Sequence, residues 1–147
     1  MNTAAVLAIL IALATGAIIG LQGPLNSQLT RTIGLMESTF LVHLTGALVL
    51  GLALSLGLGN GNLSAVGQAP PFSLSGGVLG VLIVAGVVVS ISRLGVVAGI
   101  AVALIGQLAV AAVIDHFGLF GSDPRPVGVW TLLGIALLIT GAVAVRR

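Results

Sequence analysis

GVLIVAGVVVS, the stretch from Gly80 to Ser90, decides the fold class of this chain. Its valines favour β-strands in a soluble protein. In a membrane, however, a strand must belong to a closed barrel, and barrel strands alternate between apolar and polar residues. This stretch does not alternate, so it predicts a membrane-spanning helix.

The composition of the whole chain excludes a soluble protein. Of its 147 residues, 58% are hydrophobic and 5% are charged, whereas a soluble domain carries about 25% charged residues. The chain has no cysteine, which excludes disulfide, zinc-thiolate and thiol chemistry. With 3% aromatic residues and no basic stripe, we expect no nucleic-acid partner. We therefore expect an all-α membrane protein surrounded by lipid.

Five segments are apolar and long enough to span a membrane, which requires about 20 residues. They make residues 1–147 a single five-helix transmembrane domain, with helices at about 4–29, 33–58, 72–92, 94–114 and 127–145. Loops rich in Gly, Asn and Pro follow the second and fourth segments, whereas only SISRLG joins the third to the fourth, which predicts a tight hairpin. No Lys or Arg precedes Arg31, so the first segment is interpreted as a retained helix rather than a signal peptide.

The arginines predict how the chain is oriented. Five spans place the termini on opposite sides of the membrane, with Arg31, Arg93, Arg146 and Arg147 on one side and Arg125 on the other. Cytoplasmic loops carry the excess of Lys and Arg. We therefore expect a multi-pass membrane protein with its N-terminus outside and its C-terminus in the cytoplasm.

Glycines recur at a spacing that lets two helices approach closely in lipid. The GxxxG pairs are Gly16 and Gly20, Gly76 and Gly80, and Gly95 and Gly99. Such pairs also occur by chance in apolar segments. Together they predict tight helix packing, but no single pair identifies a partner.

A lone amide interrupts the fourth segment, in ALIGQLAVAAVIDHFG (Ala103–Gly118). Gln107 lies roughly 20 Å from Leu94 along a helix, past the midplane of a hydrocarbon core about 30 Å thick. Leaving its amide unpaired there costs about 2–7 kcal/mol. Gln107 therefore either lines a polar cavity or hydrogen-bonds to a neighbouring helix, and the sequence leaves both interpretations open.

A second polar cluster occupies GLQGPLNSQL. Gln22 and Asn26 are four residues apart, so they share a face if the helix continues past Pro24, which removes one helical hydrogen bond. Kinked helices with polar flanks form binding elements in transporters. We favour that interpretation; the alternative is that the helix ends at Gly23 and the polar residues are solvated.

Two titratable residues lie in the second segment. His43 is roughly 15 Å from its start, where a histidine can relay protons, bind substrate or pack as a neutral, hydrogen-bonded residue. Glu37 falls in the first turn, where it stabilises the helix dipole and can pair with Arg31.

Asp115 lies about 12 Å along the fourth helix from Gln107. The two side chains can line one cavity, with Asp115 at its mouth, or Asp115 can pair with Arg125. The sequence contains no metal-ligand set, no supported Ser–His–acid arrangement and no phosphate-binding loop. We therefore expect no enzyme activity and no cofactor. There is also no carboxylate at the middle of any span.

Three stretches resemble the YdcZ-type family of inner-membrane exporters, which belongs to the drug/metabolite transporter superfamily. They are GAIIGLQGPLNSQLTRTIG (Gly16–Gly34), HLTGALVL (His43–Leu50) and ALIGQLAVAAVIDHFGLFG (Ala103–Gly121). The third, in which GQ is followed by an apolar run and DHFG, is the most specific. The likeness extends over nearly the whole chain.

The resemblance implies a five-helix chain that pairs with a second, inverted five-helix chain. It places Gln22, Asn26 and Gln107 at the family's recurrent polar positions, as cavity candidates, with Asp115 as a weaker fourth. Glu37 and His43 look like departures from the family, so the role of His43 as a substrate-binding candidate is particular to this chain.

These observations together predict a subunit of a small-molecule secondary transporter, an exporter that works by alternating access. Its partner is an antiparallel homodimeric copy or an oppositely oriented paralogous subunit. A neutral polar cavity indicates a substrate recognised by hydrogen bonds and shape. The alternative function is that of a non-transporting structural or assembly subunit of a membrane complex.

Overall fold

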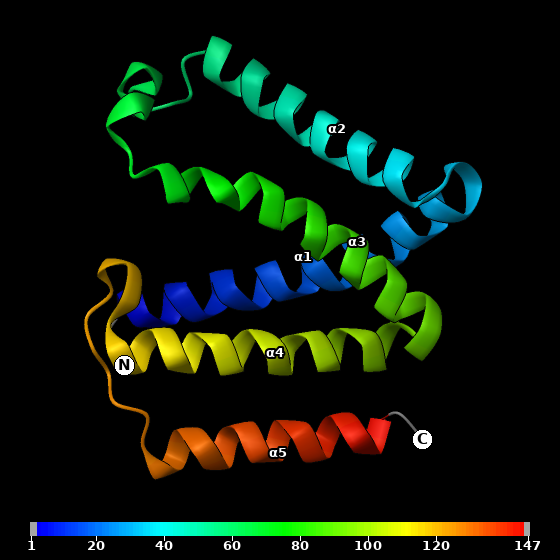
Figure 1. Cartoon of the computed structure of the whole chain (residues 1–147), viewed down its shortest axis with the longest axis vertical. Helices are drawn as coiled ribbons and strands as arrows, with labels where there is room; N and C mark the ends of the chain where they lie inside the picture. Colours follow the sequence, from blue (N-terminus) through cyan, green and yellow to red (C-terminus); the bar gives the residue numbers. More distant parts are fainter. Residues whose placement is uncertain (1–2, 146–147) are drawn as a thin grey trace. The chain divides into compact units, whose positions relative to one another are not determined.

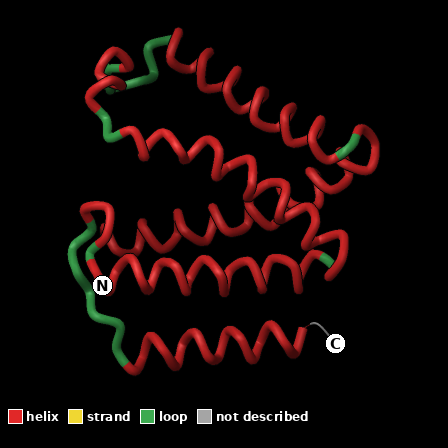
Figure 2. Tube along the Cα trace, viewed as in Figure 1, coloured by secondary structure: helices red, strands yellow, loops and turns green. Residues whose placement is uncertain are grey.

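The computed structural model describes residues 3–145, and this part of the chain is helical, without a β-strand (Figures 1 and 2). Its long helices are α1 (Thr3–Ile33), α2 (Leu35–Ser55), α3 (Gly76–Leu94), α4 (Val96–Phe117) and α5 (Val129–Val145). Short 3₁₀ helices occupy the loops: η1 (Leu63–Gln68), η2 (Pro71–Ser75) and η3 (Leu119–Gly121). The all-α prediction is confirmed for these residues. Arg146 and Arg147, used above for the orientation, lie outside the described residues.

The long helices are suited to crossing a membrane. In residues 3–145, four segments are long and apolar enough by themselves: α1, α2, the segment Pro71–Leu94 that contains α3, and α4. Helix α5 has 17 residues, or about 25 Å at 1.5 Å per residue, at the lower end of what a span requires. The chain is therefore a multi-pass membrane protein.

The chain divides into two compact units, one up to Val88 and the other from Val89 onward. The first contains α1, α2 and most of α3, and α1 packs against α2. The second contains the end of α3 with α4 and α5, and α4 packs against α5. Each unit is thus built around one pair of neighbouring helices.

A single glycine connects the helices in two of the turns. Gly34, between α1 and α2, has φ 99° and ψ 160°, and Gly95, between α3 and α4, has φ 84° and ψ 166°. This region of backbone conformation is open essentially to glycine alone. The N–H of each glycine donates to the carbonyl four residues earlier, at 2.9 Å. Each turn thus ends one helix and begins the next without an intervening loop.

Polar side chains hold the Gly34 turn together. Ser38 is 1% exposed, and its hydroxyl lies 2.6 Å from the Thr30 hydroxyl across the turn. The Ser38 and Thr39 hydroxyls also donate to the Leu35 carbonyl, at 3.0 and 2.8 Å. Interhelical hydrogen bonds of this kind contribute to helix association in lipid, where apolar surface gives no driving force.

Close backbone packing holds the Gly95 turn instead. A Cβ atom on Gly99 would lie 3.1 Å from the backbone nitrogen of Ile91 and from the carbonyl carbon of Ser90. The other GxxxG glycine with a close neighbour is Gly80, which faces His43. By contrast, nothing lies within 4 Å of a Cβ placed on Gly16, Gly20, Gly76 or Gly95.

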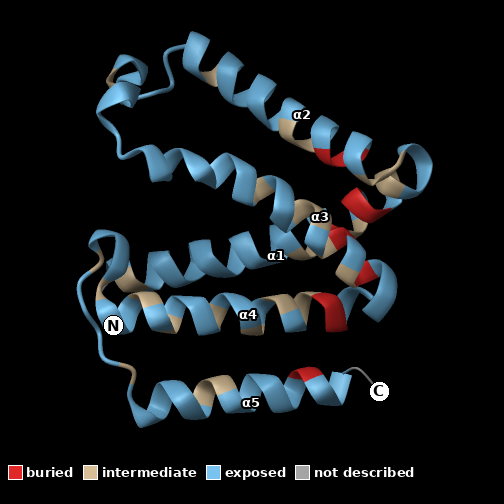
Figure 3. Cartoon of the chain, viewed as in Figure 1, coloured by how far each residue is buried: buried red, intermediate tan, exposed pale blue. Residues whose placement is uncertain are grey.

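Most large apolar side chains are exposed in the single chain (Figure 3). Among residues 3–145, the buried apolar residues are few and mostly near helix ends: Val88, Ile91, Ala98 and Ala142. Lipid tails are as apolar as these side chains, so the helices need no water-excluding core of their own. The exposed faces are available to lipid or to another subunit.

Neither ion pair considered from the sequence forms in the described chain. Glu37 lies instead against the backbone of Gly34, beyond the reach of a salt bridge to Arg31. Arg125 meets the end of α4 through its backbone, because its N–H donates to the Asp115 carbonyl at 2.6 Å. The Val127 N–H donates to Nδ1 of His116 at 3.1 Å, so the loop is fastened to α4 without a salt bridge.

Candidate functional site

Helix α1 does not end at Gly23 but continues through Pro24 to Ile33. Because proline has no N–H, the Gly20 carbonyl loses its usual helical donor. The helix remains continuous on both sides, and it therefore brings Gln22 and Asn26 onto one face, one turn apart. The alternative in which the polar residues follow the end of the helix is wrong.

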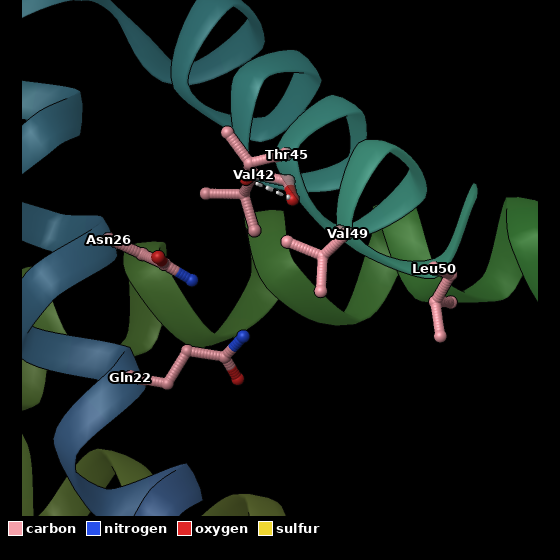
Figure 4. Close-up of a pocket in the computed structure, with 7 residues that line it drawn as sticks. Gln22, Asn26, Val42, Thr45, Val49 and Leu50 are labelled. Carbon is pink, nitrogen blue, oxygen red and sulfur yellow. Dashed lines mark hydrogen bonds between the residues drawn. The ribbon is translucent and has the colours of Figure 1, made fainter. Parts of the chain in front are cut away.

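These two amides form one wall of a pocket of about 530 Å³ between α1 and α2. Figure 4 shows both side chains reaching from α1 into the space in front of α2. The other lining residues come from α2: Val42, Thr45, Gly46, Val49 and Leu50. The site therefore has an amide wall opposite a largely apolar wall.

The amides of the pocket have no hydrogen-bond partner within residues 3–145. Asn26 is 9% exposed, yet no fully buried side-chain oxygen or nitrogen in this part of the chain lacks a partner, so its amide is accessible from the pocket. The Thr45 hydroxyl is satisfied by donating to the Val42 carbonyl at 3.0 Å. Each amide offers two donors and an acceptor oxygen, which suits a neutral, hydrogen-bonding ligand.

His43 lies beside this pocket rather than in its wall. Its Nδ1 hydrogen-bonds with the Thr39 carbonyl at 2.9 Å. Its Nε2 faces α3, 3.2 Å from where a Cβ on Gly80 would stand. The ring is half-buried at this α2–α3 contact.

Gln107 and Asp115 both lie on α4, in the second compact unit, and both are exposed. The Gln107 amide makes no hydrogen bond to residues 3–145. The second unit thus supplies no partner for this amide, and an amide in lipid requires one. The backbone carbonyl of Asp115 holds the loop at Arg125, while its side chain stays exposed.

The sequence did not single out the α2 wall of the pocket. Gly46, Val49 and Leu50 lie in HLTGALVL, one of the stretches that resemble the family, but neither they nor Val42 were predicted to bind substrate. Their spacing does follow the helical repeat, so they share one face. Which face meets α1 is set by the Gly34 turn, whose geometry the sequence does not specify. Among residues 3–145, no three His, Asp or Glu side chains gather to hold a metal ion.

Comparison with known families identifies a match over almost the whole chain. The family model described as "Putative inner membrane exporter, YdcZ" matches residues 7–144. No curated protein and no solved structure matches the chain.

Proposed function

The chain belongs to the YdcZ family of inner membrane exporters, and on that premise we propose that it is one subunit of a small-molecule exporter. The family and the apolar helices make it a multi-pass protein of the inner membrane and support a transport role. The proposal adds a binding site, a substrate class and a mechanism.

The observation that carries the proposal is the pair of unbonded amides in the α1–α2 pocket. A polar group in lipid without a partner is costly, and Gln22 and Asn26 have none among residues 3–145. Water or substrate in the pocket supplies the missing hydrogen bonds. The substrate class is a small neutral molecule with hydrogen-bonding groups on one edge and an apolar edge toward Val49 and Leu50.

The mechanism we propose is alternating access by two inverted copies of the five-helix chain, or by this chain and a paralogous partner. The exposed apolar faces and the free Gln107 amide support a second subunit, because a partner helix covers them and brings further polar groups to a shared cavity. Gln107, and Asp115 at the mouth, then contribute from α4.

A structural or assembly subunit is the alternative function. In that case the same amides hydrogen-bond to partner helices, and no water-filled path reaches them. The two functions therefore differ in whether Asn26, Gln22 and Gln107 meet water in the assembled protein.

Single cysteines test this difference without knowledge of the substrate, because the natural chain has no cysteine. The variants are Gln22→Cys, Asn26→Cys and Gln107→Cys, labelled in intact cells and in inverted vesicles with a membrane-impermeant maleimide. A thiol reacts as its thiolate, which forms in water and not in lipid. We expect labelling about tenfold faster than at a lipid-facing control, Leu21→Cys, which is 64% exposed on the same helix.

Asn60→Cys, in the exposed loop before η1, serves as the fully labelled control. Alternating access also predicts that the pocket cysteines react from both sides of the membrane. If all three variants label as slowly as Leu21→Cys, the pocket is closed to water and the structural-subunit function replaces the exporter.

A further inference from the structure

His43 occupies a position in the membrane that no other titratable side chain of this chain shares. It lies nine residues after Gly34, about 13 Å along α2 and near the middle of that helix (Leu35–Ser55). The remaining titratable side chains among residues 3–145 fall at helix ends or in loops: Arg31, Glu37, Arg93, Asp115, His116, Asp123 and Arg125. An ionisable group inside a membrane marks a proton or ion path by default.

The hydrogen bond of the ring fixes which nitrogen can take up a proton. The Thr39 carbonyl can only accept, so Nδ1, 2.9 Å away, must carry the hydrogen and donate it. In the neutral ring Nε2 then holds the free lone pair. Protonation at Nε2 leaves the bond to Thr39 intact, so the ring can change charge without leaving its position.

The surroundings of Nε2 leave room for a proton. The atom lies against Gly80, where the ring takes the space that a side chain on α3 would fill. No fully buried side-chain nitrogen among residues 3–145 lacks a partner, so Nε2 is accessible. Nε2 therefore has exposed surface at the edge of the α2–α3 contact.

No charged side chain among residues 3–145 forms an ion pair with the ring. The charged side chains of the helices that pack around it are Arg31 on α1, Glu37 on α2 and Arg93 on α3. Glu37 is six residues away, about 9 Å along α2, and Arg93 is thirteen residues beyond Gly80, about 20 Å along α3. A proton on His43 thus creates a cation that only water or an acceptor in the neighbouring pocket stabilises.

The ring also adjoins the proposed substrate pocket. Val42 and Gly46, which line the pocket, lie immediately before and three residues after His43 on α2. A charge at this point draws water toward the pocket and opposes occupation by a neutral, partly apolar molecule. Proton binding and substrate binding are thus mutually unfavourable, which is the requirement for exchange of one for the other.

We propose that His43 is the proton-binding group that couples export to the proton gradient. This rests on the proposed function for its transport role. In the outward-open state Nε2 takes up a proton and forms an N–H bond. The positive charge on the ring then displaces substrate from the neighbouring pocket. In the inward-open state that bond breaks, the proton leaves to the cytoplasm, and the neutral ring readmits substrate.

The test measures proton binding without any substrate. Purified protein in liposomes is adsorbed on a solid-supported membrane, and a pH jump from 8 to 6 is applied while the displaced charge is recorded. Protons that bind inside the membrane field produce a transient current. We expect such a transient from the natural protein and at least a tenfold smaller one from His43→Asn.

His116→Gln is the matched control, since it removes the other histidine, which lies at the end of α4 and binds the loop through its Nδ1. It should retain the transient. Gly80→Ala, which places a methyl group against Nε2, should decrease it several-fold. Equal transients from His43→Asn and the natural protein, or none from the natural protein, overturn the proposal.

A second measurement guards against a folding defect in these variants. His116→Gln leaves His43 as the single histidine, so its ring nitrogens can be assigned by ¹⁵N NMR. At pH 8 the neutral ring should carry its proton on Nδ1, and a proton on Nε2 instead contradicts the proposal. The two proposals can fail separately. If the pocket cysteines stay unlabelled but the transient current is present, the export function fails and proton binding by His43 stands. If the cysteines are labelled but the transient is absent, the reverse holds.

Discussion

At the scale of single residues, the polar side chains in the spans fall into two kinds. Ser38 and Thr39 are buried and bonded to the chain itself, across or within the Gly34 turn. Asn26 is 9% exposed and has no hydrogen-bond partner among residues 3–145. The first kind stabilises the fold, whereas the second is open to water or a ligand in the pocket, which is the role proposed for it above.

Replacing the two kinds of residue should change stability in opposite ways. Asn26→Leu removes an unpaired amide and keeps a side chain branched at Cγ, with room toward the pocket for its larger methyl groups, so the free energy of unfolding should stay unchanged or rise. Ser38→Ala leaves the Thr30 hydroxyl without its partner at 2.6 Å and should lower that free energy by about 1 kcal/mol. Both are measured by SDS titration in mixed micelles, followed by circular dichroism.

Thr140→Val is the control, because the Thr140 hydroxyl bonds only to the Ala136 carbonyl of its own helix. It should cost less than Ser38→Ala. A clear loss of stability in Asn26→Leu would show that the amide is structural, and it would remove the main support for the pocket as a binding site.

At the scale of helices, glycine acts at a few positions rather than along every GxxxG pair. Gly99 lets α4 approach the end of α3, whereas a Cβ on Gly106 of the same helix would meet nothing within 4 Å. The contrast follows from the Gly95 turn, which forces the first turn of α4 against Ser90 and Ile91.

Alanine at these two glycines should separate packing from helix propensity. Gly99→Ala places a methyl group 3.1 Å from backbone atoms that cannot rotate away, and we expect a loss of about 1–3 kcal/mol in unfolding free energy. Gly106→Ala should be neutral or stabilising by up to about 1 kcal/mol, because alanine favours helix over glycine. The same SDS titration measures both, and equal effects at the two positions contradict the packing of α4 on α3.

The sequence predicted the helical elements from apolar length alone, because lipid forces each apolar run of that length into a helix. It also predicted the loops after the second and fourth segments and the tight connection within SISRLG, but it misplaced the first connection. Residues 30–32 were placed between helices, but α1 extends to Ile33, since Gly34 alone makes the turn. Gly34, with its positive φ, replaces a loop, and the sequence around it does not distinguish it from the other glycines.

The candidate site was predictable only in its polar half. Gln22 and Asn26 stand out because an amide is costly in lipid, and their shared face follows from helix geometry. The apolar half, from Val42 to Leu50, depends on how α2 is rotated about its axis. That rotation is fixed by the Thr30–Ser38 contact and the Gly34 turn. The pattern of apolar and polar residues predicts neither of them.

At the scale of the whole molecule, the described helices have a surface suited to lipid or to the proposed second subunit. Its long helices leave large apolar side chains exposed, such as Leu82 at 62% and Leu137 at 73%. An inverted partner needs a chain that inserts the other way up. Whether that partner is a second copy or a separate chain therefore depends on how firmly this chain's own orientation is set.

The arginines give the last prediction, since they are the charges that set the orientation. Reporters fused to both termini should show a single population with the N-terminus outside, which requires an oppositely oriented paralogous partner. Arg31→Gln combined with Arg93→Gln removes both arginines at the single-glycine turns and should give two populations. Arg125→Gln, on the other side, should leave one population. Two populations already in the natural chain would instead favour a homodimer, because both orientations needed for an antiparallel pair then come from one sequence.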